Sequence, residues 1–468
     1  GEAPGGEAGT DTPGQPRARI LGEEVLRLAP DAPYKVHWPV VGGRLNLQGS
    51  GVAHCARQTT DDLENIWTWA LEHKLQLTRK ERAQLSAVLV LPDTFCAWEI
   101  KEATDILLRK LGFSSVVVHQ ESVASLFGSG ASVSCVVNIG AQSTTVCCVE
   151  EGQVLPRSRI LLPFGGVHLS ETLLWALQHT NMWQYGACSP HKSLHDAHIL
   201  DSLREEHLVL GEEAAQGMLE TAQFVVHGSK TDSRQYSVKL GNAGRIVPMG
   251  LFHPLMLQTA VRSLTPPEEE ESAEEAGVPK LARVDTTGSL HSLSSANLAT
   301  AQTPTQPAPN GTPIPEPSRQ AAIAGAQVGL PSAEDEWRVG EITGLDQAVV
   351  KSILSCVGRP DLKRRLFSNI ALAGGGANLK GLIEILEERV LMSIPADEEA
   401  DTVEVIKAKV DFSHVPWHGA VLLGVLDFAR DAWVQQEDWL DGGVKVGDSR
   451  KYSIPCNVSS QLFWFSTV

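Results

Sequence analysis

The sequence predicts an α/β protein with one long disordered insertion, and two observations lead to that prediction. Short apolar runs alternate along the chain with segments that repeat apolar residues at helical spacing. One stretch of about 70 residues, rich in Pro, Glu, Ser and Thr, interrupts this pattern. The chain has 468 residues, 42% of them hydrophobic, which is enough for two or three domains with a substantial core.

The first well-defined elements form a strand–helix–strand–helix series. Ala87–Leu91 is an apolar run of strand length, and Glu99–Leu111 repeats apolar residues every three or four positions. Ser115–His119 is predicted to be a second strand, and a short helix, Ser122–Phe127, is predicted to end at Gly128. This alternation supports the α/β class.

A β-hairpin is predicted next. Two apolar runs, Ser132–Ile139 and Thr144–Val149, flank the polar turn Gly140–Ser143, which is the pattern of two strands joined by a tight turn. A third strand, Arg159–Leu162, leads into a predicted helix, Leu169–Gln178. The hairpin therefore places a glycine-bearing turn between two buried strands.

A second glycine-bearing turn lies near the other end of the chain. Gly374–Gly376 follows the predicted strand Ile370–Ala373 and precedes the predicted helix Leu379–Val390. Glycines let the backbone approach a phosphate or a nucleotide base, and N–H groups in such turns can hold anions. Either turn alone is more often only a tight turn, so each signal is weak.

Composition excludes several classes of function. Lys and Arg total 39 against 56 Asp and Glu, and the resulting balance of −17 disfavours direct binding of a phosphate backbone. No apolar stretch approaches the ~18–20 residues of a transmembrane helix. The eight cysteines form no C-x-x-C pair, so we expect free thiols in a reducing compartment and no metal site.

Several segments, in order, resemble the actin-like ATPase superfamily. They are Tyr34–Pro39, Asp61–Trp67, Val116–Gly128, Pro248–Pro254 and Trp417–Gly424, together with the hairpin turn and the Gly-Gly turn. The resemblance implies two duplicated ribonuclease-H-like domains, with phosphate held by the hairpin turn and adenosine by the Gly-Gly turn. It runs from about Val25 to about Trp439.

Within that superfamily, three features are most similar to the nuclear actin-related proteins of the INO-eighty-type chromatin-remodelling complex. These features are His119–Ser125, Cys147–Gly152 and the insertion that follows Phe252–Pro254. The resemblance implies an architectural nuclear subunit that binds a remodeller's ATPase scaffold helix, actin and another actin-related protein. It also implies contact with histones and the nucleosome, with DNA contact mainly through the complex and no membrane contact.

The resemblance also gives the expected domain organisation. We expect a disordered tail (1–19), a partial first actin-like domain (20–130), a second actin-like domain (131–264), the disordered insertion (265–336), the remainder of the actin-like fold (337–440) and a divergent C-terminal tail (441–468). The family's first phosphate loop, a Gly-rich turn after an early strand, is not visible. We interpret the N-terminal part as truncated, and replacement of that loop by residues 1–24 is the alternative.

The positions that carry catalysis in the family are degenerate. The two aspartates of the phosphate hairpin correspond to Asn138 and Ala141, and an amide and a methyl group cannot hold a hydrated Mg²⁺ as carboxylates do. The glutamine that orients the attacking water corresponds to Glu121. Phosphoryl transfer depends on positioning and charge neutralisation, so we predict no catalytic residue and little or no ATP hydrolysis.

The nucleotide-binding positions survive better, and ATP is the candidate cofactor, weakly bound and not turned over. The residues that match are Gly140, Gln142, Ser143, Gly166, Arg204, Glu205, Gly374, Gly375 and Gly376. The alternative for the glycines is that turn geometry alone requires them. Two other functions stay open: an active ATPase or sugar-kinase-like enzyme of the same superfamily, and a cytoskeletal actin-related protein.

The tryptophans can be interpreted either as core residues or as part of a surface that binds a partner. Trp67, Trp69, Trp175, Trp183, Trp417, Trp433 and Trp439 lie on predicted apolar helical faces. We expect them to pack in the core, and a partner surface is the alternative.

Overall fold

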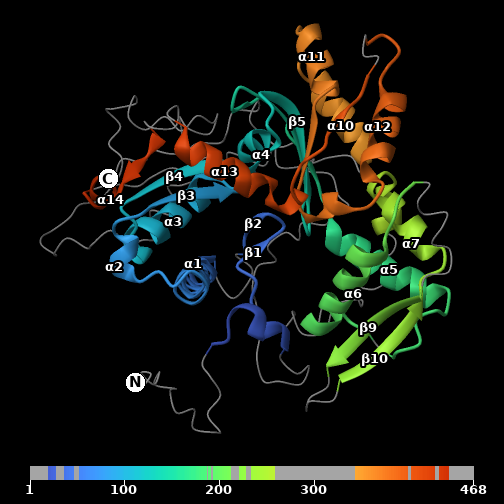
Figure 1. Ribbon diagram of the computed structural model, residues 1–468, viewed down its shortest axis with the longest axis horizontal. Helices are drawn as coiled ribbons and strands as arrows, with labels where there is room; N and C mark the ends of the chain where they lie inside the picture. The colour runs from blue at the N-terminus through green and yellow to red at the C-terminus, as the bar shows by residue number, and fades with distance from the viewer. Residues whose placement is uncertain are drawn as a thin grey trace, which may run out of the picture.

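The computed structural model describes most of the predicted folded segments. The described residues are 19–27, 36–46, 52–155, 157–186, 188–190, 193–211, 221–227, 233–258, 343–398, 402–426 and 432–441. The predicted insertion at 265–336, nearly all of the predicted N-terminal tail and residues 442–468 lie outside them. Figure 1 shows two α/β lobes side by side, which confirms the α/β class.

The first lobe is built on a three-stranded sheet. Its order is β13 (Val434–Gln435), β4 (Ser115–Gln120) and β3 (Ser86–Leu91). β3 and β4 are parallel, and β13 runs antiparallel to β4. The strands predicted at 87–91 and 115–119 are therefore confirmed to within one residue.

Helices fill one side of this sheet. α1 (Val52–Trp69), α3 (Ala97–Asp105) and the π-helical turn η3 (Ile106–Leu111) share a hydrophobic core with β4. The helix predicted at 99–111 is therefore continuous, but its last part changes from α-helical to the wider π-helical geometry. It ends at Gly112, whose φ of +80° is the left-handed conformation that glycine favours.

Glu99 fixes a short hairpin to the start of α3. The hairpin consists of β1 (Val40–Val41) and β2 (Arg44–Leu45). The Glu99 carboxylate accepts hydrogen bonds from Arg44 Nε at 2.7 and 2.9 Å, from the Leu45 N–H at 2.9 Å and from the Cys96 N–H at 2.7 Å. Because Glu99 is only 2% exposed, its charge depends on these partners.

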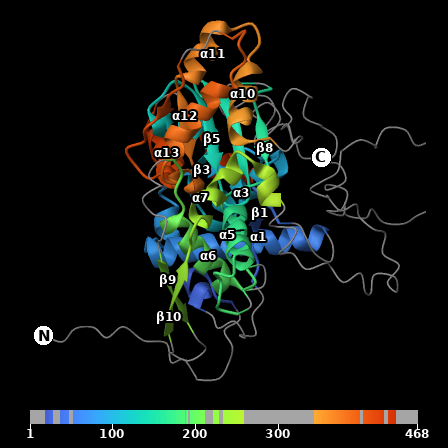
Figure 2. The same cartoon turned by 90° about the vertical axis from the view of Figure 1, so that its right-hand side faces the viewer.

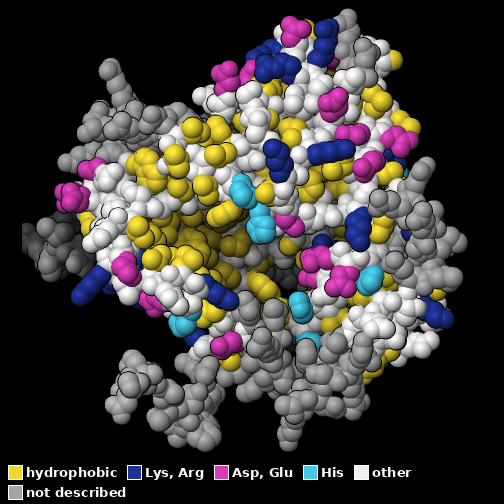
Figure 3. Space-filling view, in the orientation of Figure 1, with side chains coloured by type: hydrophobic (Ala, Val, Ile, Leu, Met, Phe, Trp, Pro, Cys, Tyr) yellow, Lys and Arg dark blue, Asp and Glu magenta, His cyan; other side chains and the backbone are white. Residues whose placement is uncertain are grey.

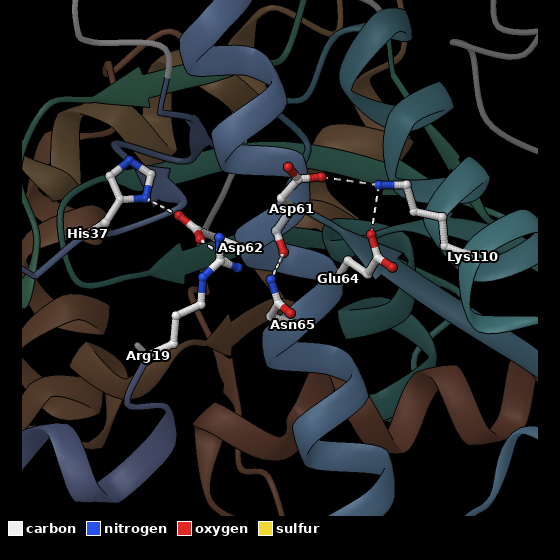
Figure 4. A network of polar contacts seen from close by, with 7 residues as sticks. All are labelled: Arg19, His37, Asp61, Asp62, Glu64, Asn65 and Lys110. Carbon is white, nitrogen blue, oxygen red and sulfur yellow. Dashed lines mark hydrogen bonds and ion pairs between the residues drawn. The ribbon is translucent and has the colours of Figure 1, made fainter. Parts of the chain in front are cut away.

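A polar network anchors α1 on both sides, as Figure 4 shows. On one side Lys110 Nζ lies 2.7 Å from a Glu64 oxygen and 3.5 Å from an Asp61 oxygen. On the other side His37 Nδ1 lies 2.5 Å from Asp62 Oδ2. The acidic side chains of α1 therefore connect this helix to η3 on one side and to the segment before β1 on the other.

The second lobe contains the larger sheet. Its order is β12 (Val405–Ile406), β11 (Ile370–Ala373), β5 (Val133–Ile139), β6 (Thr144–Glu150) and β7 (Gln153–Val154), with β8 (Ile160–Leu162) also paired to β6. β12, β11 and β5 are parallel, and β5 and β6 form the predicted antiparallel hairpin. Every residue of β5 and β11 is buried, so the strands predicted at 132–139 and 370–373 form the centre of this lobe.

Helices enclose the second sheet and complete the largest core. They are α5 (Gly166–His179), α6 (Leu194–His207), α10 (Leu345–Leu354), α11 (Pro360–Phe367) and α12 (Leu382–Ser393). Leu173, Leu177, Val349, Phe367 and Leu386 are fully buried there. The helices predicted at 169–178 and 379–390 are confirmed, each displaced by about three residues at its start.

α4 (Glu121–Ser129) joins the two sheets and packs against α13 (Val415–Val425). The helix backbones nearly touch: a Cβ added at Gly419 would lie 1.7 Å from the Ala124 oxygen, and one at Gly128 would lie 2.0 Å from the Val415 oxygen. The prediction that α4 ends at Gly128 was wrong. The helix continues to Ser129 and is capped by Gly130, and Gly128 is there because of the close approach of α13.

The prediction that Trp417 packs in the core was also wrong. Its side chain is 62% exposed on α13, whereas Trp439 is 8% exposed as expected. Figure 3 shows apolar side chains gathered on this face of the molecule, along α13 and in the hollow beneath it. Helical periodicity alone could not tell which apolar face of this helix is covered.

A two-stranded hairpin extends from the base of the second lobe, seen at the bottom of Figure 2. β9 (Thr221–His227) and β10 (Ser233–Lys239) pair in register from Thr221–Lys239 to His227–Ser233. Phe224 stacks on Trp183 with ring centroids 5.7 Å apart, and it meets Tyr185 edge-on at 5.4 Å. An isolated hairpin is only marginally stable, so this aromatic cluster is what holds the hairpin to the lobe.

The remaining short elements connect these parts. They are η1 (Gly22–Arg27), η2 (Ala70–Lys74), α2 (Arg79–Arg82), α7 (Ala243–Ile246), η5 (Val247–Leu251), η6 (Gly375–Asn378), η7 (Phe412–His414) and α14 (Gln436–Leu440). No helix in the described part of the chain is both long and apolar enough to cross a membrane.

Candidate functional site

The two glycine-bearing turns meet at one end of the second sheet. The parallel register of β11 and β5 places Ala373 beside Asn138, so the turns that follow these strands are neighbours. Gly374 has a φ of +85°, and a Cβ there would lie 2.4 Å from Asn138 Oδ1 and 2.5 Å from the Ile139 oxygen. Only glycine fits at position 374, so the backbone geometry is a sufficient reason for this glycine, with or without a bound nucleotide.

The hairpin turn Gly140–Ser143 is locked against the start of α5. The Gly140 N–H donates to the Ser143 oxygen at 3.0 Å, which closes the turn. The Gly166 and Val167 N–H groups donate to the Gly140 and Ala141 oxygens at 3.0 and 2.8 Å. These N–H groups of the first turn of α5 are therefore engaged with the protein and are not directed at a ligand.

The turn between β1 and β2 reaches across from the first lobe to the hairpin turn. The Gly42 N–H donates to Gln142 Oε1 at 2.5 Å. Thr94 Oγ1, just after β3, donates to the Gly43 oxygen at 2.5 Å. Gln142, predicted to bind nucleotide, is thus used as a link between the lobes, and sequence reasoning did not identify Gly42 or Gly43.

Two carboxyl groups lie together between the sheets. Asp93 is buried and accepts hydrogen bonds from the Ser122 N–H at 2.9 Å and from Ser122 Oγ at 2.5 Å. Burial raises the pKa of Glu121 to about 7, and the neighbouring Asp93 raises it too, whereas a hydrogen bond with Asn138 opposes the rise. At neutral pH the pair therefore carries less negative charge than two free carboxylates.

Sequence reasoning identified Glu121 and Asn138 but missed Asp93. Burial raises the pKa of Asp93, while the hydrogen bonds from Ser122 and the charge of Arg159 oppose that effect. Arg159 is 5% exposed and precedes β8. The available signal was the polar Asp93 two residues after the predicted strand at 87–91, because residues that follow parallel strands gather at one sheet edge.

The expected adenosine side is assembled around Arg204 on α6. Its Nε donates to Ser170 Oγ at 3.1 Å, and its terminal nitrogen lies 2.8 Å from a Glu205 oxygen. A Cβ at Gly166 would lie 2.8 Å from the Arg204 guanidinium. The structure therefore brings Gly166, Arg204 and Glu205 together, and Glu205 remains 66% exposed in its side chain.

The Gly-Gly turn leaves one open position. A Cβ at Gly375 would meet nothing within 4 Å, whereas one at Gly376 would lie 2.4 Å from Ile139 Cγ2. Gly375 is the glycine of this turn that a ligand can approach, and Gly376 is required by packing. The roles assigned to these residues from the sequence stay predictions.

The described residues of the hairpin turn offer poor ligands for a magnesium ion. Asn138 and the exposed Ala141 provide no carboxylate at the hairpin turn. Among the described residues, no group of three or more His, Cys, Asp or Glu side chains is arranged to hold a metal. Asn138 Oδ1 is buried and has no hydrogen-bond partner among the described residues, and as an amide oxygen it carries no charge that could hold a metal ion.

Comparisons with known proteins agree with this geometry. The family model named Actin matches residues 50–207 and 295–451. Actin-related protein 9 of Arabidopsis thaliana is 34% identical over 456 residues, covering 96% of this chain and 69% of that relative. Actin-related protein 8 of Aedes aegypti is 30% identical over 454 residues, covering 93% and 76%.

A solved structure gives the same similarity. Human actin-related protein Arp8 in its ATP-bound state is 26% identical, with a TM-score of 0.68, and the match covers 92% of this chain and 72% of that chain. The similarity to actin-related protein 8 that His119–Ser125 and Cys147–Gly152 predict is confirmed, and it extends to actin-related protein 9. The actin-like fold predicted from the sequence is likewise confirmed.

Proposed function

This chain belongs to the actin family, and from that premise we propose that it is an architectural subunit of a nuclear chromatin-remodelling complex that hydrolyses little or no ATP. In this role its actin-like body docks on a helix of the remodeller's ATPase scaffold, together with actin and another actin-related protein. It contributes to nucleosome recognition through histones or linker DNA. The similarity to actin-related proteins 8 and 9 supports the proposal.

The observation that carries the docking role is the exposed apolar stripe of α13. Trp417, Val421 and Val425 follow one another at four-residue spacing and are 62%, 48% and 82% exposed, and Leu422 beside them is 49% exposed. The opposite side of α13 is buried against α4. A helix that is apolar on both sides needs a second partner, and an amphipathic helix is the partner that fits an apolar stripe of this length.

We further propose that ATP binds without turnover. The ATP-bound state of the human structural neighbour supports ATP as the ligand, and the open position at Gly375 is consistent with it. Asn138 and Ala141 offer no carboxylate for a hydrated metal ion that would neutralise charge on the β- and γ-phosphates during transfer. The site therefore favours ATP binding without ATP hydrolysis.

The charge balance shapes the proposed contacts. A chain with a balance of −17 repels phosphate backbones, so DNA is best reached through other subunits. Basic histone segments suit an acidic surface. Nuclear localisation follows from this role and is part of the same proposal.

Binding to a remodeller's helical actin-binding segment tests the docking role. Val425→Asp should weaken binding by at least about tenfold, because a carboxylate would be buried in an apolar contact. Met392→Asp on α12, at a residue 74% exposed, is the matched control and should change the affinity less than about twofold. Equal effects of the two substitutions, or no binding by the folded wild type, would contradict the docking role.

Nucleotide titration and steady-state hydrolysis test the second proposal. We expect ATP binding that is insensitive to Mg²⁺, with hydrolysis at background. The double change Asn138→Asp and Ala141→Asp should make ATP binding Mg²⁺-dependent, because it restores two carboxylates at the turn. Wild-type hydrolysis that Glu121→Gln abolishes would instead establish the ATPase alternative.

A further inference from the structure

Glu121 occupies the junction between the two sheets of the molecule. It is the first residue of α4, directly after β4, and it is half-buried. The buried Asp93 carboxyl group, two residues after β3 in the first lobe, acts on it electrostatically. The Asn138 side chain, on β5 in the second lobe, hydrogen-bonds to it. Glu121 therefore interacts with both lobes just before the hairpin turn begins.

The surroundings of Glu121 hold no cation that would balance a negative charge there. Among the described residues, no Lys or Arg forms an ion pair with Glu121, and Arg159 acts on Asp93 instead. Burial lowers the pKa of His119 on β4 to about 4 and raises the pKa of Cys147 on β6, so both side chains are neutral at pH 7. Two carboxyl groups thus share one guanidinium.

The other elements packed on α4 add no charge beside Glu121. β3, β5, β7 and β11 contain no charged residue, and α13 approaches α4 at Val415 and Gly419. β6 carries only Glu150, which pairs with an arginine at the end of the strand remote from the hairpin turn. The charge state of Glu121 is therefore set by Asp93 and by any ion that binds at the glycine-bearing turns.

ATP at these turns would bring further negative charge to the two carboxyl groups. The hairpin turn begins two residues after Asn138, and neither Asn138 nor Ala141 can hold a cation that would screen the phosphates. Nearby like charges favour the neutral form of a carboxyl group. An amide can donate to a carboxylate or accept from a carboxylic acid, so Asn138 can remain the partner of Glu121 in both states.

We propose that ATP binds together with one proton, which Glu121 takes up, so that this residue makes the nucleotide affinity depend on pH. This inference rests on the ATP binding proposed above. In the free protein, burial and then Asp93 raise the pKa of Glu121 to about 7, and the bound phosphates raise it further. The ATP affinity is therefore constant below about pH 7 and falls as the pH rises toward the pKa of the bound state.

Isothermal titration calorimetry of the 468-residue chain with ATP, without added metal ions, measures this proton. At pH 8, titrations in buffers of different ionisation enthalpy should show the uptake of about one proton per ATP bound. Between pH 7 and pH 8.5 the dissociation constant should rise about tenfold. An infrared difference spectrum should show that the carbonyl stretch of a carboxylic acid appears on ATP binding.

Glu121→Gln keeps a hydrogen-bonding side chain beside Asn138 but cannot take up a proton. It should bind ATP without proton uptake and without the infrared band, and its affinity should change less than about twofold over the same pH range. The control Glu384→Gln, at an exposed position of α12, should behave like the wild type.

The outcomes separate this inference from the binding on which it rests. Wild-type ATP binding without proton uptake, or proton uptake that persists in Glu121→Gln, would overturn the role of Glu121 alone. An absence of ATP binding at every pH would contradict ATP binding itself, and this inference with it.

Discussion

Glu121→Gln should stabilise the protein at alkaline pH and have almost no effect at acidic pH. Glu121 lies beside Asp93 at the start of α4, and burial raises its pKa from 4.5 to about 7 in the folded protein. The folded state therefore holds a proton that the unfolded state has already released. The stability that this proton contributes is complete below about pH 4.5 and is lost as the pH rises to about 7.

The magnitude follows from the two pKa values. The interval from 4.5 to about 7 corresponds to about 3 kcal/mol, at roughly 1.4 kcal/mol per pH unit. This is an upper limit, because the Glu121 side chain is only partly buried. The neutral amide that Glu121→Gln introduces avoids the charge, so the advantage of the variant should grow by about 2–3 kcal/mol between pH 5 and pH 8.

Thermal unfolding of both proteins across pH 4.5–8.5 measures this effect. For a folded chain of this size we expect the melting temperature of Glu121→Gln to exceed that of the wild type by about 3–6 °C at pH 8. Glu384→Gln, at an exposed position of α12, is the control and should show no pH-dependent difference. A difference that is the same at every pH, or that favours the wild type above pH 7, would refute the reasoning.

Three further substitutions probe the fold around the site. Gly419→Val should lower the free energy of unfolding by about 3 kcal/mol or more, because its Cβ would lie 1.7 Å from the Ala124 oxygen. The control Gly375→Ala, whose Cβ meets nothing within 4 Å, should have a melting temperature within about 2 °C of the wild type. Phe224→Ala should cost about 3–5 kcal/mol locally and expose the β9–β10 hairpin to proteolysis, and unchanged cleavage would count against the aromatic anchor. Glu99→Ala should cost about 2–4 kcal/mol and release the β1–β2 hairpin, seen as faster amide exchange at residues 40–45; retained protection would contradict this role.

Most of the fold was predictable because its signals are local. The apolar runs at 87–91, 133–139 and 370–373 are continuous because both faces of each strand are covered or nearly so. Glycines mark both the turn between β5 and β6 and the turn at Gly374, and at Gly374 the backbone geometry requires one. The resemblance to the actin family then placed these local elements in one architecture.

What escaped prediction depends on contacts between distant segments. Gly128 looks like a helix terminator, but its neighbour Val415 is almost 300 residues away, and only the folded structure reveals the contact. The strands of the β1–β2 hairpin are only two residues long, too short to show the alternation of a strand. The sequence therefore offered no sign of this hairpin or of the hydrogen bond between Gly42 and Gln142. Asp93 and Arg159 likewise meet only through the packing of the two sheets.

The contact between α4 and α13 has a mechanical consequence. In the described chain, the passages from one sheet to the other include β4 to β5, through α4, and β12 to β13, through α13. These two passages lie side by side with their backbones almost touching. We therefore expect any rotation of one lobe against the other to pivot about this line, with displacements that grow with distance toward α2 and the β9–β10 hairpin (Figure 1).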